Sequence, residues 1–327
     1  MIGVISYLVF FATVASILAI AVLGLNLQWG NAGLFNGGIA AFFGAGAYGT
    51  LILGTTPQTA HIGGFGWPFA FALMGGMAIA AALAWIVGRL TLRLRHDYLA
   101  IATFGVAVAF ENVMRNATTL SGGAQGVRGF ARPLQAQIGA GLFYNTLYLT
   151  LVVALLLATY LCLERLLRSP FGRLVRAIRE DEDAAQSLGK SPSKVRLTAF
   201  IAGSVIMGLA GGLYGGFYAF VSPQDVLPIL TFQIWAMLIV GGAGNNRGAV
   251  MGAFLIWGAW TASGWALSKF APVEAQLYAG SIQYILIGSV IVGMLLWRPQ
   301  GLFPEQLLVS HSGQNIKTNE PTKGKRT

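Results

Sequence analysis

The residues able to do acid–base or metal chemistry are few and widely spaced in this sequence. Three histidines, His61, His96 and His311, lie far apart, and the single cysteine, Cys162, sits inside an apolar run. One cysteine excludes an intrachain disulfide and a cysteine-based metal cluster, and no H-E-x-x-H or C-x-x-C motif occurs. We therefore expect no enzymatic centre and no cofactor in this chain.

Glu111 is the acidic residue best placed for chemistry within an apolar segment, where charged groups are costly and are kept for function. Arg115 follows four residues later, so the two side chains share one helix face and can pair. Two interpretations stay open for Glu111: an ion pair at the membrane edge, or a part of a gate or substrate path.

Two glycine motifs resemble nucleotide-binding loops without fitting them. Residues 44–49 match G-x-G-x-x-G, but they lie inside an apolar segment rather than between a strand and a helix. Residues 189–191 end like a phosphate-binding loop, yet Ala184 stands where the first glycine of that loop is required. The sequence therefore reveals no ATP site in this chain.

Polar, glycine-bearing segments interrupt the apolar sequence at residues 26–38 and 241–248. Non-helical backbone at membrane depth is tolerated only where it is buried in protein or lines a wet cavity, and such breaks mark substrate paths in transporters. A tight turn at the membrane surface is the alternative. The candidates for a substrate path, besides Glu111, are Asn26, Gln28, Asn31 and Asn36.

The segment 167–195 carries the most specific pattern. Pro170 sits near the first position of a predicted helix, an apolar stripe with helical spacing follows, and Gly189 suits a helix C-cap. The stripe consists of Phe171, Leu174, Val175 and Ile178. We expect an amphipathic element outside the membrane that docks into a groove of another protein. The acidic run at 180–183 argues against its lying flat on anionic lipid.

Composition indicates the elements that position these residues. The sequence is 55% hydrophobic and only 10% charged, whereas soluble domains contain about a quarter charged residues. We therefore expect an all-α, polytopic transmembrane helical bundle in a lipid bilayer, with about nine helices and one or two interrupted segments. The expected helices cover residues 3–28, 36–54, 66–90, 97–115, 142–166, 196–221, 228–245, 248–269 and 278–297.

Gly208, Gly212 and Gly216 repeat every four residues, and so do Gly248 and Gly252. This spacing predicts helix faces that another backbone can approach closely. In lipid there is no hydrophobic drive between helices, so close packing has to hold the bundle together.

Lysines and arginines are distributed unevenly about these helices. A cytoplasmic location for the loop 165–196 puts 17 of the 21 Lys and Arg residues on that side, in agreement with the positive-inside rule. The N-terminus is then outside and the C-terminus inside. The same distribution accounts for the net charge of +10 without a nucleic-acid partner.

Residues 183–189, Asp-Ala-Ala-x-x-x-Gly, resemble the E-A-A-x-x-x-G coupling motif of ABC-importer permeases, with Asp183 in place of Glu. Residues 169–173 and 176–180 are similar to the same loop in permeases of branched-chain amino acid ABC transporters of the LivM type, and so is the ending at 297–303. The resemblance extends over most of the chain.

The resemblance implies the membrane-spanning subunit of an ATP-driven importer in the bacterial inner membrane. Its partners would be cytoplasmic ATP-binding subunits, a second related permease subunit in a heterodimer, and a periplasmic substrate-binding protein. The transmembrane permease domain would cover residues 1–308, including a cytoplasmic coupling loop at 167–195, and residues 309–327 would form a disordered basic tail. The residues implied to couple to the ATPase are Phe171, Arg173, Arg176, Asp183, Ala184, Ala185 and Gly189.

Two other functions stay open at this point. Relatives of this family also move urea, so a permease for urea or another small amide is the alternative within the class. An ATP-independent secondary transporter is the alternative from another class. Such a transporter should carry intramembrane acids that couple to ions, and Glu111 is the one convincing candidate.

Overall fold

The computed structural model describes residues 2–56, 64–94, 96–130, 132, 135, 139, 141–270, 278–298 and 300–305. Helices are the only extended regular elements in these residues, which confirms the all-α prediction. Seven helices are long and apolar enough to cross a membrane, but the described residues contain twelve α-helices in all, so the count of about nine is not confirmed. The expected tail at 309–327 lies outside the described residues.

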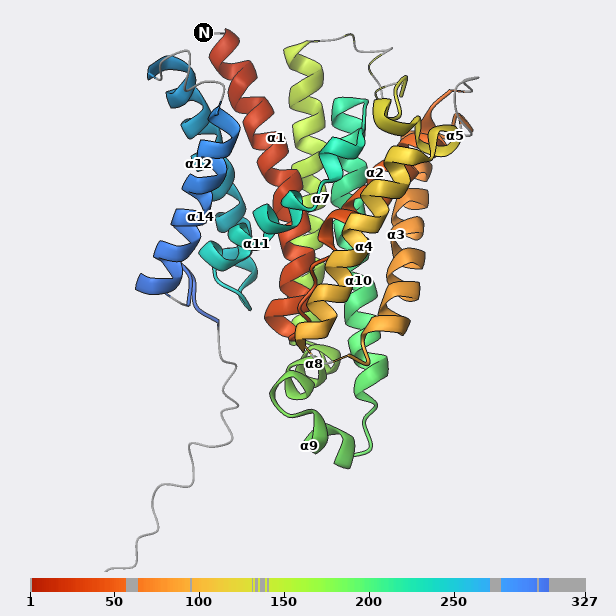
Figure 1. Ribbon diagram of the computed structural model, residues 1–327, viewed down its shortest axis with the longest axis vertical. Coiled ribbons are helices and arrows are strands. Elements are labelled where there is room, and N and C mark those ends of the chain that lie inside the picture. The colour runs from red at the N-terminus through yellow and green to blue at the C-terminus, as the bar shows by residue number, and fades with distance from the viewer. Residues whose placement is uncertain are drawn as a thin grey trace, which may run out of the picture.

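The α-helices are α1 (Ile2–Leu25), α2 (Ile39–Gly54), α3 (Phe69–Thr91), α4 (His96–Asn116), α5 (Thr118–Ser121), α7 (Leu142–Arg168), α8 (Pro170–Glu180), α9 (Glu182–Ser187), α10 (Pro192–Tyr218), α11 (Ile229–Gly241), α12 (Asn246–Phe270) and α14 (Ala279–Trp297). A π-helical turn, η1 (Asn26–Asn31), extends α1, and short 3-10 helices form η2 (Gly123–Gln125) and η3 (Pro223–Val226). The start of α1 lies at the end of the bundle opposite α8 and α9 (Figure 1), as the expected topology requires.

The short helix α2 is the centre of the bundle. Every residue from Ile39 to Leu51 is buried, because α2 is apolar all round and packs against α3 and α10. The helix has only 16 residues, about 24 Å at 1.5 Å per residue, which is less than the thickness of a bilayer core. The extended segment before it, residues 33–38, therefore carries the chain into the interior of the protein.

Glycines form the crossing points of this core, as their spacing predicts. A Cβ atom on Gly46 of α2 would meet the backbone of Gly208 on α10, and one on Gly24 of α1 would lie 2.6 Å from the carbonyl oxygen of Gly203. A Cβ on Gly252 would similarly meet the backbone of α11. These helices approach backbone to backbone, so any side chain at the crossings would force them apart.

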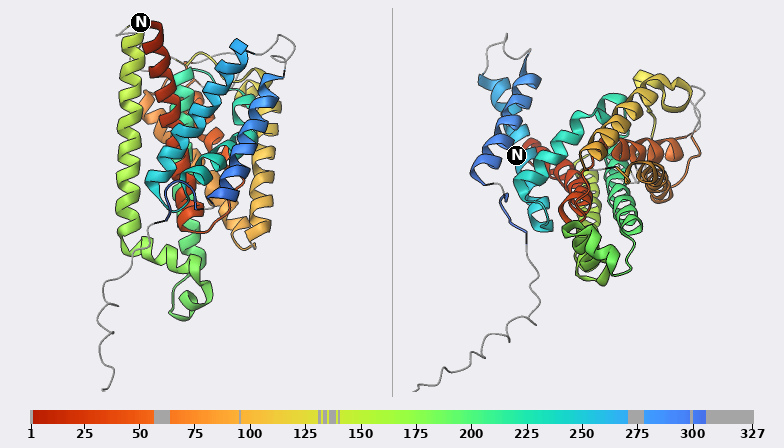
Figure 2. Two further views of the ribbon diagram at one scale, coloured as in Figure 1. Left: turned by 90° about the vertical axis from the view of Figure 1, so that its left-hand side faces the viewer. Right: turned by 60° about the horizontal axis from the view of Figure 1, so that its bottom comes forward.

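The helices α12 and α14 lie at one side of the bundle (Figure 2). α14 packs on α11 and α12. None of the residues described in its membrane-length part, Gly280–Trp297, is buried. Its large exposed side chains are mostly apolar and include Ile285 and Leu296. This edge of the molecule is therefore suited to lipid or to another apolar surface, in contrast to the closed core around α2.

Candidate substrate path and coupling element

The first predicted break is a buried network of amide groups. Asn26, Gln28, Asn31 and Asn36 are at most 1% exposed. The Gln28 side chain donates to the carbonyl oxygen of Phe200 at 2.7 Å and to Ser204 Oγ at 3.0 Å, and its Oε1 accepts from Asn36 Nδ2 at 2.8 Å. The amide of Gln28 thus ties the π-helical turn η1 to α10 and to the start of α2.

The structure joins the first predicted break to the second. Asn26 Nδ2 donates to Asn246 Oδ1, and the backbone N–H of Gly244 donates to Asn26 Oδ1, both at 2.8 Å. Asn31 Nδ2 donates to the carbonyl oxygen of Asn26, while Asn31 Oδ1 is buried without a partner. Nearly all of the hydrogen-bonding capacity of these side chains is therefore taken up within the protein, which stabilises irregular backbone in the interior.

The two short apolar helices begin side by side. The backbone N–H of Ala40, in the first turn of α2, donates to Thr231 Oγ1, in the first turn of α11, at 3.1 Å. The Trp235 indole N–H donates to the carbonyl oxygen of Asn36 at 3.0 Å. Discontinuous helices that meet inside a bundle are a feature of transporter substrate sites, so cavities around this junction are candidates for the substrate path.

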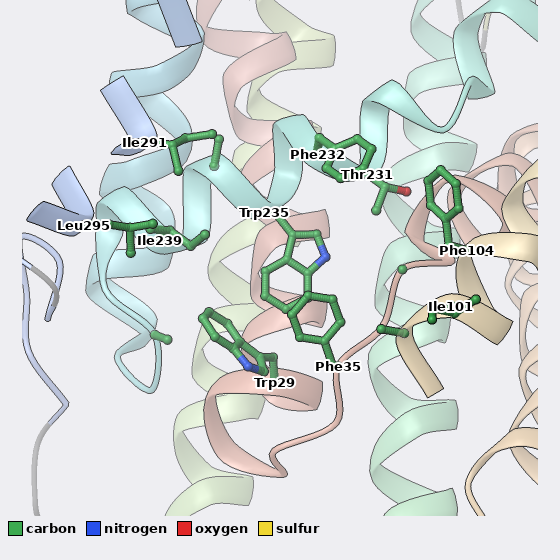
Figure 3. Close-up of a pocket in the computed structure, with 14 residues that line it drawn as sticks. Trp29, Phe35, Ile101, Phe104, Thr231, Phe232, Trp235, Ile239, Ile291 and Leu295 are labelled. Atoms are coloured by element: carbon green, nitrogen blue, oxygen red, sulfur yellow. The ribbon is translucent and has the colours of Figure 1, made fainter. Parts of the chain in front are cut away.

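One face of α11 borders an apolar cavity of about 600 Å³, which we call the apolar cavity (Figure 3). Its floor is aromatic: the rings of Phe35 and Trp235 stack with centroids 4.1 Å apart, and Trp29 lies 4.5 Å from Trp235. Residues of α4 and α14 form the other walls. None of the described residues that line this cavity is charged.

A different face of α11, with Leu230 and Gln233, borders a second cavity of about 340 Å³, which we call the Asp225 cavity. Asp225 caps η3: its Oδ2 accepts from the backbone N–H of Ser222 at 2.8 Å and from Ser222 Oγ at 2.7 Å. The Tyr214 hydroxyl donates to Asp225 Oδ1 at 3.1 Å. Residues of α1, α2, α10, α12 and α14 complete the walls.

The sequence analysis missed Asp225 because it falls in a short gap between two expected helices. The Ser-Pro-x-Asp pattern at 222–225 is a recognisable capping box, and the structure contains it. That signal predicts a helix start, not a carboxylate in a cavity. The cavity beside Asp225 is completed by α1, α2 and α12, which are remote in sequence.

The predicted loop element at 167–195 forms two helices. Asp181 separates them, and its side chain accepts from the Ala184 backbone N–H as the N-cap of α9. The apolar stripe of α8 faces the bundle, since Val175 and Ile178 are each 2% exposed. The prediction of an amphipathic helix is confirmed, but its apolar face packs on this chain rather than awaiting a partner.

The implied coupling residues therefore divide into two groups. Phe171 and Arg176 are partly buried, and Ala185 is buried. The exposed residues are Arg173, Asp183, Ala184 and Gly189. Leu188, beside Gly189, is 80% exposed. The tip of α9 and the turn after it thus form the free surface of the loop, and α8 is its anchor.

Arg179 connects the two candidate regions. Its guanidinium donates from Nη1 to the carbonyl oxygen of Gly30 in η1 and from Nη2 to Glu305 Oε1 at 2.9 Å. A second ion pair, Arg196 Nη1 with Glu182 Oε2 at 2.7 Å, fastens α9 to the start of α10. Arg179 thus links α8 to the break at the end of α1.

Glu111 lies apart from these regions. It is 6% exposed and accepts from Arg115 Nε at 2.7 Å, so the predicted pairing is confirmed. Glu111 is not among the residues that line either cavity. His61 and His311 lie outside the described residues.

Comparison with known proteins assigns the chain to a family. Residues 7–295 match the family described as branched-chain amino acid transport system / permease component. The high-affinity branched-chain amino acid transport system permease protein LivM of Escherichia coli is 33% identical over 316 residues, covering 90% of this chain and 69% of that protein. A probable LivM of Methanocaldococcus jannaschii is 27% identical and covers 88% and 90% of the two chains.

The fructose import permease protein FrcC of Rhizobium meliloti is a more distant relative, 26% identical over 59% of this chain. No solved structure matches the chain. The family match extends over both breaks, the α8–α9 loop and nearly every membrane-length helix. This chain belongs to the family of permease components of branched-chain amino acid transport systems.

Proposed function

We propose that this chain is the membrane-spanning permease subunit of an ATP-driven importer for branched-chain amino acids in the bacterial inner membrane. One observation carries the mechanism: Arg179 fastens the α8–α9 loop to the interrupted end of α1. A loop that protrudes from the bundle and is bonded to a helix break is suited to transmit the movement of a bound partner to the membrane helices. The family supports this substrate and gives no support to urea or to a secondary transporter.

Cytoplasmic ATP-binding subunits would meet the exposed tip of α9. Asp183, Ala184 and Gly189 would contact the ATPase there, with Leu188 as an apolar anchor and Arg173 at the edge. Phe171, Arg176 and Ala185 would hold the loop in shape. Arg176 donates to the carbonyl oxygen of Leu167 at 2.8 Å, at the end of α7, so a load on α8 passes to a second helix.

Asn26, Gln28, Asn31 and Asn36 would shape the substrate path by holding the break, and Glu111 would stabilise the outer part of α4. A periplasmic binding protein would deliver the amino acid, and a second, related permease subunit would pair with this one. We assign the permease domain to residues 1–308 and treat 309–327 as a separate tail.

Reconstitution of the chain with its partner subunits tests the function. Proteoliposomes that contain the complete complex, the binding protein and ATP should accumulate labelled L-leucine, and vesicles without ATP should not. The substitution Ala185→Arg should abolish uptake while the chain still inserts, because a guanidinium does not fit a site that is 6% exposed. Uptake of urea but not leucine, or leucine uptake without ATP, would overturn the proposal.

A further inference from the structure

We infer that the Asp225 cavity is the site where the bundle binds a zwitterionic, apolar amino acid during transport. The inference rests on the proposed function and adds to it a binding site with named residues. The cavity volume of about 340 Å³ lies at the small end of ligand sites, which run from about 300 to 1,000 Å³. It is therefore sized for one small molecule.

The cavity offers a partner for a positive charge. An amino acid brings an ammonium group, which is costly to bury without an opposite charge or a π face. The Asp225 carboxylate lines the cavity together with several aromatic residues. Trp260 and Tyr284 have ring centroids 5.2 Å apart, and Tyr214 and Tyr218 4.5 Å apart, so aromatic pairs from two sides flank the space.

It also offers an unused donor for a negative charge. Trp257 lines the cavity, and its indole N–H is buried without a hydrogen-bond partner. Buried tryptophan N–H groups ordinarily find an acceptor, since leaving one unpaired costs free energy. The amide side chains of Gln224 and Gln233 lie in the same lining and would donate to a ligand carboxylate, and a shift of the indole ring on binding would bring the Trp257 N–H to the same carboxylate.

The remaining wall suits a branched aliphatic side chain. Val14 and Leu18 from α1, Phe43 from α2 and Leu230 from α11 line the cavity. The apolar cavity has no charged residue in its described lining, so it does not offer partners for both ends of a zwitterion. This contrast assigns the amino acid to the Asp225 cavity rather than to the larger one.

The site is also connected to the coupling loop. Phe43 lies one turn into α2, the helix that follows the break held by Arg179. The first turn of α2 bonds to α11 through Ala40 and Thr231, and α11 carries Leu230 and Gln233 of the cavity wall. A shift of α8 would thus reach the binding site through η1 and α2.

Uptake of labelled L-leucine by proteoliposomes containing the complete transporter tests the inference. Trp257→Phe removes a donor that has no partner among the described residues, so the transporter should still assemble. It should lower uptake about tenfold or more, the effect of losing one hydrogen bond to a charged group. The control Trp265→Phe changes an exposed tryptophan two turns further along α12 and should leave uptake unchanged.

Asp225→Asn should also lower uptake about tenfold or more, through loss of the charge. Because Asp225 caps η3, Ser222→Ala serves as its control: it weakens the cap but keeps the carboxylate, and it should transport nearly as well as the wild type. Equal losses in Asp225→Asn and Ser222→Ala would reduce Asp225 to a structural role and overturn its part in binding.

The outcomes separate the two proposals. Wild-type uptake together with unchanged uptake in both Trp257→Phe and Asp225→Asn would overturn the binding site and leave the importer function standing. Absence of ATP-driven leucine uptake by the wild type would overturn the proposed function, and the binding site with it. Wild-type uptake with selective loss in the two variants establishes the site.

Discussion

The turn at the end of α1 and the region around η3 place their polar side chains differently. At the end of α1, the buried amides of Gln28 and Asn36 are bonded to each other, and those of Asn26 and Gln28 are bonded to α12 and α10. Around η3 and the start of α11, a carboxylate borders a cavity and the indole N–H of Trp257 lacks a partner. A buried network bonded across several elements favours one arrangement, whereas a carboxylate on the wall of a cavity is placed to meet a ligand.

This difference suggests a division of labour within one bundle. The break at η1 is clamped by Arg179 and is built to transmit movement as a unit. The region at η3 is built to receive a ligand. Substitutions in the first region should therefore affect stability and coupling, and substitutions in the second should affect transport more than stability.

The largest effect is expected from Gln28→Leu. It leaves Asn36 Nδ2 without its acceptor, at about 1–3 kcal/mol for a buried group, and removes the bonds of Gln28 to Phe200 and Ser204, at about 1 kcal/mol more. The free energy of unfolding should therefore fall by about 2–4 kcal/mol. Thermal unfolding of the purified chain in detergent measures this loss.

The control Asn112→Ala changes an exposed amide that bonds only to its own helix, through the carbonyl oxygen of Val108. Its stability should stay within about 0.5 kcal/mol of the wild type. If Gln28→Leu were as stable as Asn112→Ala, the amide network at η1 would not stabilise the bundle as described.

Arg179→Met should uncouple the transporter. The substitution removes both the bond to the carbonyl oxygen of Gly30 and the ion pair with Glu305, so uptake should fall about tenfold while the ATPase subunits still bind and hydrolyse ATP. The exposed pair of Arg168 with Glu164 provides the control Arg168→Met, which should retain uptake because such pairs contribute little. Equal uptake in Arg179→Met and Arg168→Met would show that the bonds of Arg179 do not couple α8 to the break.

Tyr214→Phe should have a moderate effect. The hydroxyl of Tyr214 donates to Asp225 Oδ1 and orients a carboxylate that Ser222 also holds. Loss of one of several bonds should lower uptake by about threefold, less than Asp225→Asn does. A KM and Vmax comparison of the two variants checks the order, and a larger defect in Tyr214→Phe would contradict the role given to Asp225.

The smallest effect on stability is expected from Trp257→Phe. The indole N–H that this substitution removes has no hydrogen-bond partner among the described residues. The free energy of unfolding should therefore change by at most about 0.5 kcal/mol. The same unfolding assay as for Gln28→Leu provides the measurement. A loss comparable to that of Gln28→Leu would mean that the two regions do not differ as described.

Features encoded in local sequence were predictable. Membrane character follows from composition, and the start of α8 follows from Pro170. Glycine spacing indicates that α10 has a face suited to close packing, but not that α2 packs on it. The pairing of Arg115 with Glu111 follows from their separation by one helical turn. The polar break at 26–38 was recognised because amides and glycines interrupt an apolar run.

Features set by remote contacts were not predictable. The spacing of Val175 and Ile178 indicates an apolar stripe, but only the packed bundle shows that it faces inward. The contact of Asn26 with Asn246 spans 220 residues. The cavity around Asp225 needs helices from both ends of the chain, so neither its location nor the unpaired Trp257 N–H can be read from a local pattern.

Co-purification with the ATP-binding subunits tests the central claim, coupling through the α8–α9 loop, most directly. Gly189 has a φ of +74° and its N–H donates to the carbonyl oxygen of Gln186; proline permits neither. Gly64, in the segment before α3, is a matched control, with a φ of +82° and an N–H that donates to the carbonyl oxygen of Ile52. We predict that Gly189→Pro loses the ATPase and Gly64→Pro retains it. Retention by both variants, or no ATPase on the wild type, would contradict the account.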